Sequence, residues 1–268
     1  MTEQRVAQGC ICRALGLGDR GMVSLVGAGG KTSLLYRLAR ELTMDGRRVL
    51  VTTTTHMMRP QPEEAVTTLL SPDPGEILEE LRGLPASLGP ALAASHQEVQ
   101  GEKLVGFSPE GVESIWRPGL LDWILVEADG ASRRPLKAPA SHEPVVPVSS
   151  GWVVGLVGLD AVGKPLDEPW VFRWEIFGRL SGLTRGQEVT PESVARLALH
   201  PEGLFRGAPE GALRVLWLNK ADMPGAVSAA RRIVSFIASE GWGNIGRAVV
   251  GSTRGPEPAM ACFGPPGA

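Results

Sequence analysis

A glycine-rich turn followed by a lysine and a hydroxyl side chain carries the clearest chemistry in this sequence. It follows an apolar run at 22–26, precedes a helical pattern at 34–42, and consists of Gly27, Ala28, Gly29, Gly30, Lys31, Thr32 and Ser33. Glycines let the backbone curl so that amide groups point inward, and a helix N-terminus adds partial positive charge. Lys31 would then reach the terminal phosphates of a nucleotide, and Thr32 would bind Mg²⁺. The turn predicts a phosphate-binding loop.

The spacing of this turn departs from the full phosphate-loop pattern. That pattern has a glycine five residues before Gly30, where this chain has Leu25. The loop that begins at Gly27 is therefore two residues shorter than the standard one. A tight strand-to-helix turn that binds nothing is the alternative, so the interpretation depends on the other motifs.

An acidic pair ends the apolar strand expected at 122–127. The residues there are Glu127, Ala128, Asp129 and Gly130. A carboxylate beside a phosphate loop can offset the charge of Mg²⁺ and position water. We assign Asp129 to the metal and Glu127 to orienting water, with the exchange of these roles left open. An acidic turn that uses Gly130 for a positive φ is the alternative.

Two further segments place polar side chains at expected strand ends. The run 52–56 holds four threonines and a histidine, in which Thr54 could bind Mg²⁺ and His56 a phosphate or a substrate. The loop after Asp129 carries three cations, Arg133, Arg134 and Lys137. The arginines would stabilise charge on a transferred phosphoryl group. They would equally suit an anionic substrate or partner, or a solvated loop.

An Asn-Lys-x-Asp pattern follows the strand expected at 213–218, with Asn219, Lys220 and Asp222 as its polar members. This is the guanine-reading pattern of GTPases. A carboxylate can accept two hydrogen bonds from guanine, whereas adenine presents an acceptor there and is disfavoured. Chance loop composition is the alternative to this reading. The pattern favours GTP over ATP.

Apolar runs that alternate with helical patterns position these motifs. We expect strands at 22–26, 48–53, 122–127, 152–157, 213–218 and 247–250, and helices at 34–42, 75–84, 168–182, 191–199 and 229–237. The predicted fold is a three-layer, P-loop NTPase-like α/β domain, with a mainly parallel sheet and helices on both faces. Ligands of such sheets bind beyond the carboxyl ends of the strands, where all the motifs fall.

Domain organisation follows from the same pattern. We expect an N-terminal extension over 1–20 and one domain over 21–253, with an irregular insertion at about 57–119 that contains the helix at 75–84 and a short strand at 103–107. The Gly/Pro-rich tail at 254–268 is expected to be poorly ordered.

Composition excludes several classes of function. The net charge of −2 argues against a nucleic-acid binder. No apolar run reaches the roughly 18 residues of a membrane span, and the N-terminus lacks the apolar core of a secretory signal. Three cysteines fit a reducing cytoplasm. Cys10 and Cys12 are interpreted as ordinary thiols, since a zinc site needs four ligands, with a metal or selenium role left open.

Taken together, seven segments resemble the YqeC family of selenium-dependent molybdenum hydroxylase accessory proteins. They span about residues 20–252 and comprise the glycine-rich turn at 26–32, the threonines at 51–55, the acidic pair at 126–130, and the segments 134–139, 142–147, 158–166 and 218–222. The resemblance implies a cytoplasmic nucleotide-binding protein that helps to mature a molybdenum hydroxylase, by enabling selenium insertion. The motif order is also similar to that of metallocentre-maturation GTPases, a fold-level analogy.

Three hypotheses follow for the biochemical role. The first is a Mg²⁺-dependent NTPase, GTP favoured over ATP, that acts as a maturation factor and has a hydroxylase or another maturation factor as its partner. The second is a transferase or ligase that uses ATP to activate a small acid or selenium compound, in a second pocket lined by His56, Arg133, Arg134, Lys137 and His142. The third is a non-catalytic, nucleotide-gated binding module.

Overall fold

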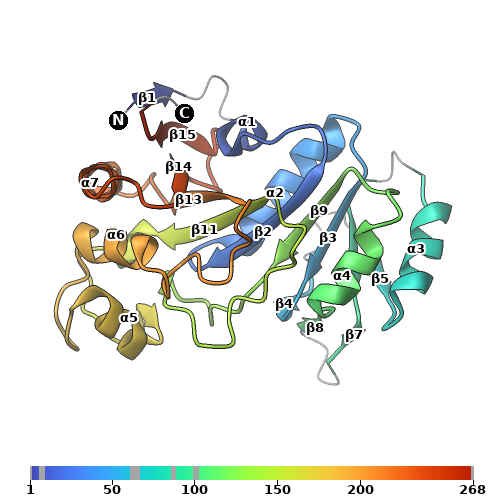
Figure 1. Ribbon diagram of the computed structural model, residues 1–268, viewed down its shortest axis with the longest axis horizontal. Helices are drawn as coiled ribbons and strands as arrows, with labels where there is room; N and C mark the ends of the chain where they lie inside the picture. The colour runs from blue at the N-terminus through green and yellow to red at the C-terminus, as the bar shows by residue number, and fades with distance from the viewer. Residues whose placement is uncertain (1, 6–9, 61–66, 86–88, 99–102, 267–268) are drawn as a thin grey trace.

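A ten-stranded sheet forms the centre of the molecule in the computed structural model, which describes residues 2–5, 10–60, 67–85, 89–98 and 103–266 (Figure 1). In their order across the sheet, the strands are β1 (Thr2–Arg5), β15 (Ala259–Gly264), β14 (Ile245–Gly251), β13 (Leu213–Asn219), β11 (Trp152–Gly158), β2 (Gly21–Gly27), β9 (Trp123–Glu127), β3 (Val49–Thr53), β6 (Ala91–Ala94) and β5 (Thr67–Leu70).

The strands from β5 across to β14 pair in parallel, and only β15 and β1 run antiparallel to their neighbours. The chain moves to one side of β2 to build β3, β5, β6 and β9, then crosses to the other side for β11, β13 and β14. Strand order therefore reverses at β2, and such a reversal opens a crevice beyond the carboxyl ends of the strands. The phosphate-loop candidate follows β2 directly.

Helices cover both faces of this sheet. On one face, α1 (Ile11–Leu15) and α2 (Lys31–Met44) share a hydrophobic core with the inward side chains Val23 and Leu25 of β2. The helices on the other face share a second core with Met22 and Val26; they are α3 (Pro74–Gly83), α4 (Pro109–Trp116), α5 (Trp174–Ser181), α6 (Pro191–Leu199) and α7 (Ala226–Ser239). The alternation along β2 matches a strand buried on both sides. The predicted α/β class, with helices on both faces of a mainly parallel sheet, is confirmed.

The segment expected to be an irregular insertion is largely structured. It supplies β5 and β6 to the central sheet, and β4 (His56–Met58), β8 (Lys103–Val105) and β7 (His96–Gln97) form a small antiparallel sheet. The helix expected at 75–84 and the short strand expected at 103–107 are present as α3 and β8. The strand β6 was not predicted because it consists of three alanines and a leucine, all buried, which gives neither alternation nor β-branched side chains.

The helix expected over 168–182 begins later, at Trp174. Residues of β12 (Val171–Phe172) pair instead with β10 (Leu136–Lys137) in a two-stranded sheet, and a short 3₁₀ turn, η3 (Leu159–Ala161), follows β11. By contrast, α6 has the predicted bounds, with Thr190 as its N-cap and Pro191 in its first turn.

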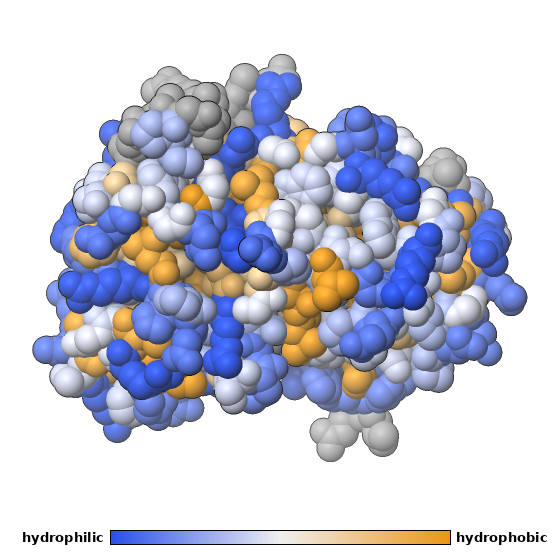
Figure 2. Space-filling model, viewed as in Figure 1, coloured by the Kyte–Doolittle hydropathy of each residue, from blue (hydrophilic) through white to orange (hydrophobic). Residues whose placement is uncertain are grey.

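The tail expected to be poorly ordered contains β15, which pairs with β14 and with β1. Cys262 and Phe263 are buried there, so apolar packing outweighs the flexibility that flanking glycines and prolines suggest. Elsewhere on the surface, the described part of the face in Figure 2 mixes hydrophilic residues with separate hydrophobic patches. Among the described residues, no helix is long and apolar enough to cross a bilayer.

Candidate functional site

The turn between β2 and α2 adopts the conformation that its glycines predict. Gly27, Gly29 and Gly30 all have positive φ, of 87°, 87° and 129°. A side chain at Gly29 would collide with the backbone of Gly158, and one at Gly30 with the amide of Asn219. Only glycine therefore fits both positions, and the turn can pass close to the ends of β11 and β13.

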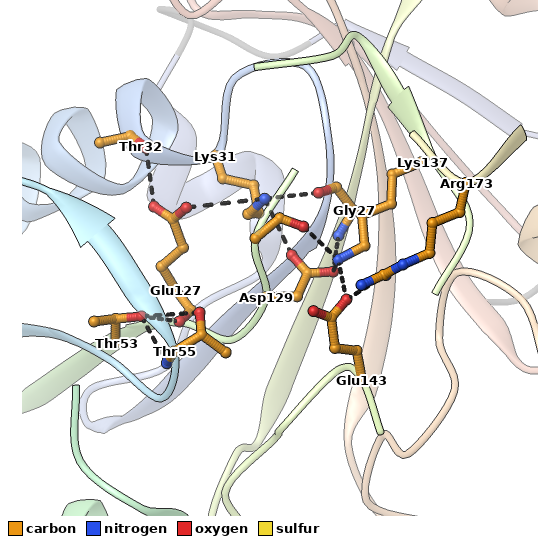
Figure 3. Close-up of polar contacts among 11 residues, drawn as sticks. Gly27, Lys31, Thr32, Thr53, Thr55, Glu127, Asp129, Lys137, Glu143 and Arg173 are labelled. Atoms are coloured by element: carbon orange, nitrogen blue, oxygen red, sulfur yellow. Dashed lines mark hydrogen bonds and ion pairs between the residues drawn. The ribbon is translucent and has the colours of Figure 1, made fainter. Parts of the chain in front are cut away.

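Lys31, the first residue of α2, lies buried beneath this turn. Its ammonium donates a hydrogen bond of 2.7 Å to the Gly27 carbonyl and lies 3.0 Å from Asp129 Oδ1 (Figure 3). Glu127 Oε1 lies farther away, at 3.9 Å. Although burial disfavours the charged lysine, Asp129 and Glu127 outweigh it and raise the pKa of Lys31. The ammonium is therefore held charged and in one position.

Asp129 has partners on both carboxylate oxygens. Its Oδ2 accepts a hydrogen bond of 3.0 Å from the Gly27 amide and lies 2.9 Å from Lys137 Nζ, while Oδ1 faces Lys31. Only 1% of its surface is exposed. Asp129 is thus a buried hub that joins the phosphate-loop candidate to the segment after β9.

Glu127, at the end of β9, faces the first turn of α2 instead. Its Oε2 accepts a hydrogen bond of 2.9 Å from Thr32 Oγ1. Burial raises the pKa of Glu127 and exceeds the opposing effects of Lys31 and Thr32. A carboxyl group whose pKa is raised next to a cavity is typical of a functional position.

The network of charges continues beyond Asp129 to two partly buried residues that sequence reasoning missed, Glu143 and Arg173. Lys137 Nζ lies 2.5 Å from Glu143 Oε2, and Arg173 lies 2.6 Å from the same oxygen (Figure 3). Although burial favours the neutral acid, Arg173 and Lys137 lower the pKa of Glu143 to about 2. Arg173 adopts a left-handed conformation with φ of 59°. Glu143 lies in the segment 142–147, which resembles the family, but no local spacing marks Arg173 as its partner.

At the end of β13, the side chain of Asn219 is fully used inside the protein. Its amide nitrogen donates a hydrogen bond of 2.7 Å to the Gly29 carbonyl, and its oxygen accepts one of 3.0 Å from the Thr253 amide. Lys220 pairs with Asp160 at 2.5 Å, whereas Asp222 is exposed. Asn219 therefore fixes the turn to the loop after β14, and Asp222 keeps its carboxylate accessible.

The loop after β14 is also tied to α2. Arg37 donates hydrogen bonds to the carbonyls of Thr253, Gly255 and Pro256. Thr253 and Arg254 lie on the wall of the cavity described below. Helix α2 thus positions Lys31 at its first residue, and its Arg37 holds the loop that forms the opposite wall of the cavity.

These groups surround a cavity of about 870 Å³ beyond the strand ends. Most of the predicted site residues line it, namely Gly29, Gly30, Lys31, Thr32, Ser33, Glu127, Arg133, Arg134, Asn219, Lys220 and Asp222. His56, Lys103 and Asp160 also line the wall. The sequence motifs, which are far apart along the chain, therefore meet at one cavity.

Several predicted residues lie outside this wall. The amides of Gly27 and Ala28 donate to Asp129 and to the Leu156 carbonyl, and Thr54 Oγ1 donates to the Val145 carbonyl at 2.6 Å. These two amides and this hydroxyl are therefore engaged within the fold.

The second pocket expected from the sequence does not form as predicted. His56, Arg133 and Arg134 share the cavity of the phosphate-loop candidate. Lys137 is buried against Asp129, and the side chain of His142 is 73% exposed at the surface. The error arose because the loop after β9 folds Lys137 inward to satisfy Asp129, which its sequence position alone does not reveal.

Comparison with known proteins gives two matches. A family model described as "YqeC protein" matches residues 23–175, from β2 into α5. The protein named "Uncharacterized protein YqeC" from Escherichia coli (strain K12) is 39% identical over 199 residues, which cover 74% of this chain and 75% of that protein. The family match includes the phosphate-loop candidate, the acidic strand end and Arg173, and it ends before Asn219.

Proposed function

Since this chain belongs to the YqeC family, we propose that it binds and hydrolyses a nucleoside triphosphate with Mg²⁺, with GTP favoured over ATP. The observation that carries this proposal is the buried Lys31 ammonium at the start of α2. It lies on a glycine turn at the wall of a large cavity, where strand order reverses. Such an arrangement suits a polyanion, because the ammonium and the helix N-terminus both favour negative charge.

The phosphates would contact the turn and the first residues of α2. Gly29, Gly30, Thr32 and Ser33 line the cavity there. Lys31 Nζ donates a hydrogen bond to the Gly27 carbonyl and forms an ion pair with Asp129. An ammonium has three hydrogens, so in this proposal one of them would reach a phosphate oxygen while the buried network holds the lysine in place.

Mg²⁺ fits Thr32 and Glu127 better than Asp129. Both oxygens of Asp129 already face cations or an amide, whereas Thr32 and Glu127 present hard oxygen ligands 2.9 Å apart at the cavity wall. We therefore assign Glu127 to the metal and Asp129 to positioning Lys31. When bound, Mg²⁺ would neutralise charge on the phosphates.

The base would lie toward the ends of β13 and β14. Asp222 offers an accessible carboxylate on that wall, and a carboxylate accepts two hydrogen bonds from guanine. Asn219 would position the turn rather than read the base, since its amide is already fully engaged.

A second candidate function, phosphoryl or nucleotidyl transfer to a small acid or selenium compound, has its own support. His56, Arg133 and Arg134 line the same cavity as the phosphate-loop candidate. An anionic acceptor bound in this cavity would contact their side chains. In the hydrolytic proposal the same arginines would stabilise the charge of the transferred phosphoryl group.

For the physiological role, we propose an accessory factor in the maturation of a selenium-dependent molybdenum hydroxylase in the cytoplasm. The support is the resemblance of the motif segments to that family. The partner would then be the hydroxylase or another maturation factor, with neither nucleic acid nor membrane involved.

Equilibrium titration with fluorescent GTP and ATP analogues, with and without Mg²⁺, tests the binding proposal. We expect Lys31→Ala to weaken triphosphate binding about 10- to 100-fold, as for loss of a charge-assisted hydrogen bond. Asp222→Asn should remove the preference for GTP, whereas Asp19→Asn, an exposed carboxylate away from the cavity, should leave it intact. Unchanged binding by the Lys31 variant would refute the phosphate-loop assignment.

Phosphate release then separates the alternatives. Release with GTP alone, or on adding a hydroxylase partner, supports the NTPase. Release that requires a small acceptor supports the transferase. Tight binding without turnover in any condition supports a nucleotide-gated binding module and would overturn the hydrolytic part of the proposal.

A further inference from the structure

Two thiols and a carboxylate meet at the start of α1, outside the cavity wall. One ligand atom from each of Cys10, Cys12 and Glu41 lies within 4.8 Å of the others, and all three residues are partly buried. Glu41 belongs to α2, ten residues after Lys31, or about 15 Å along the helix axis. The Cys-x-Cys pair supplies two ligands, and the fold adds Glu41 as a third.

The carboxylate is held in position by the backbone of α1. Glu41 Oε2 accepts hydrogen bonds from the amides of Ile11, at 2.8 Å, and Cys12, at 3.2 Å. Cys10 Sγ donates to the same oxygen at 3.3 Å. The two amide hydrogen bonds orient the ligating carboxylate and reduce the cost of ordering it when an ion binds.

We propose that Cys10, Cys12 and Glu41 form a binding site for a thiophilic divalent cation of the Zn²⁺ type. Two thiolates and one carboxylate suit Zn²⁺, which takes tetrahedral sulfur, nitrogen and oxygen ligands. Three protein ligands leave a fourth position for water or an external ligand, as in sites that exchange what they bind. Each thiol releases one proton to solvent when its bond to the cation forms.

Helix capping alone would account for Glu41, but it gives the thiols no role. The side chains of Cys10 and Cys12 point to one carboxylate from alternate positions of the same turn.

Metal titration of the reduced full-length chain tests the site. With Cd²⁺ as a spectroscopic substitute, we expect a thiolate charge-transfer band that saturates at one ion per chain, and Zn²⁺ should compete for it. Zn²⁺ should also raise the melting temperature, because it binds the folded state.

The variants separate ligation from capping. The double variant Cys10→Ser, Cys12→Ser should lose the band, whereas Cys262→Ser, which changes the remaining cysteine, should keep it. Glu41→Gln keeps an acceptor for the α1 amides but removes the charge, so metal affinity should fall by at least about 10-fold, the smaller loss seen for an outer partner of a ligand, while the apo protein stays folded. A chain that takes up no stoichiometric metal, or whose binding is the same in the double variant or in Glu41→Gln, would overturn the proposal.

Discussion

Replacing Lys137 tests whether the buried charge network stabilises this fold. Lys137 Nζ lies 2.5 Å from Glu143 and 2.9 Å from Asp129, and 1% of its side chain is exposed. Lys137→Met keeps most of the aliphatic stem but removes the cation between the buried carboxylate of Asp129 and the partly buried carboxylate of Glu143. Removing one partner of a buried ion pair costs about 3–5 kcal/mol. Since Arg173 still pairs with Glu143 and Lys31 with Asp129, we expect the lower end, about 3 kcal/mol.

A matched control is present in the same chain. Lys220 lies at the same 2.5 Å from Asp160, but 38% of its side chain is exposed. An exposed ion pair contributes at most about 1 kcal/mol, so Lys220→Met should cost far less than Lys137→Met. The two substitutions thus differ in burial and in the second carboxylate, Asp129, that Lys137 also faces.

Urea unfolding followed by tryptophan fluorescence and circular dichroism measures both losses. With a denaturant slope of about 3 kcal/mol per M, the midpoint should fall by about 1 M for Lys137→Met and by about 0.3 M or less for Lys220→Met. Equal midpoint shifts for the two variants would refute the reasoning, because burial would then make no difference to the ion pair.

Three further predictions address the pH dependence and the walls of the cavity. Because the pKa of Glu143 is about 2 in the folded chain and 4.5 otherwise, its pairing stabilises the fold above about pH 4.5 and is lost toward pH 2. Glu143→Gln should flatten this part of the pH–stability curve, measured by urea unfolding at each pH. Arg37→Ala should free the loop 253–256, which limited proteolysis would detect, and weaken nucleotide binding about 5- to 10-fold, as for loss of about 1 kcal/mol. Gly30→Ala should lower the melting temperature more than Gly46→Ala, since both have positive φ but only Gly30 has a side chain in the way.

Much of the fold was predictable because its strands and helices obey simple periodic rules. The strands β2, β3, β9, β11, β13 and β14 lie within a residue or two of their predicted bounds. Each is an apolar run buried on both faces, and Thr190–Pro191 marked the start of α6. The misses, β5, β6 and β15, are short strands of small or mixed residues whose pairing depends on neighbours from distant parts of the chain.

The candidate site was also predictable in part. Motifs at strand ends predicted which residues approach the cavity, because parallel strands bring their carboxyl ends to one edge. The sequence did not show whether Glu127 or Asp129 has a carboxylate available for Mg²⁺. Lys137 points inward and pairs with Asp129, and Arg173, from a distant part of the chain, pairs with Glu143. These long-range ion pairs have no local sequence signal.

The pairing of β1 with β15 has a consequence for the order in which the protein assembles. Thr2 lies opposite Gly264, so this ladder joins residues separated by nearly the whole chain. Because the entropy lost in closing a loop grows with its length, we expect β1 to pair with β15 after the parallel strands have formed. In native-state hydrogen exchange it should also be among the first regions to open, while the strands that end at the cavity stay protected.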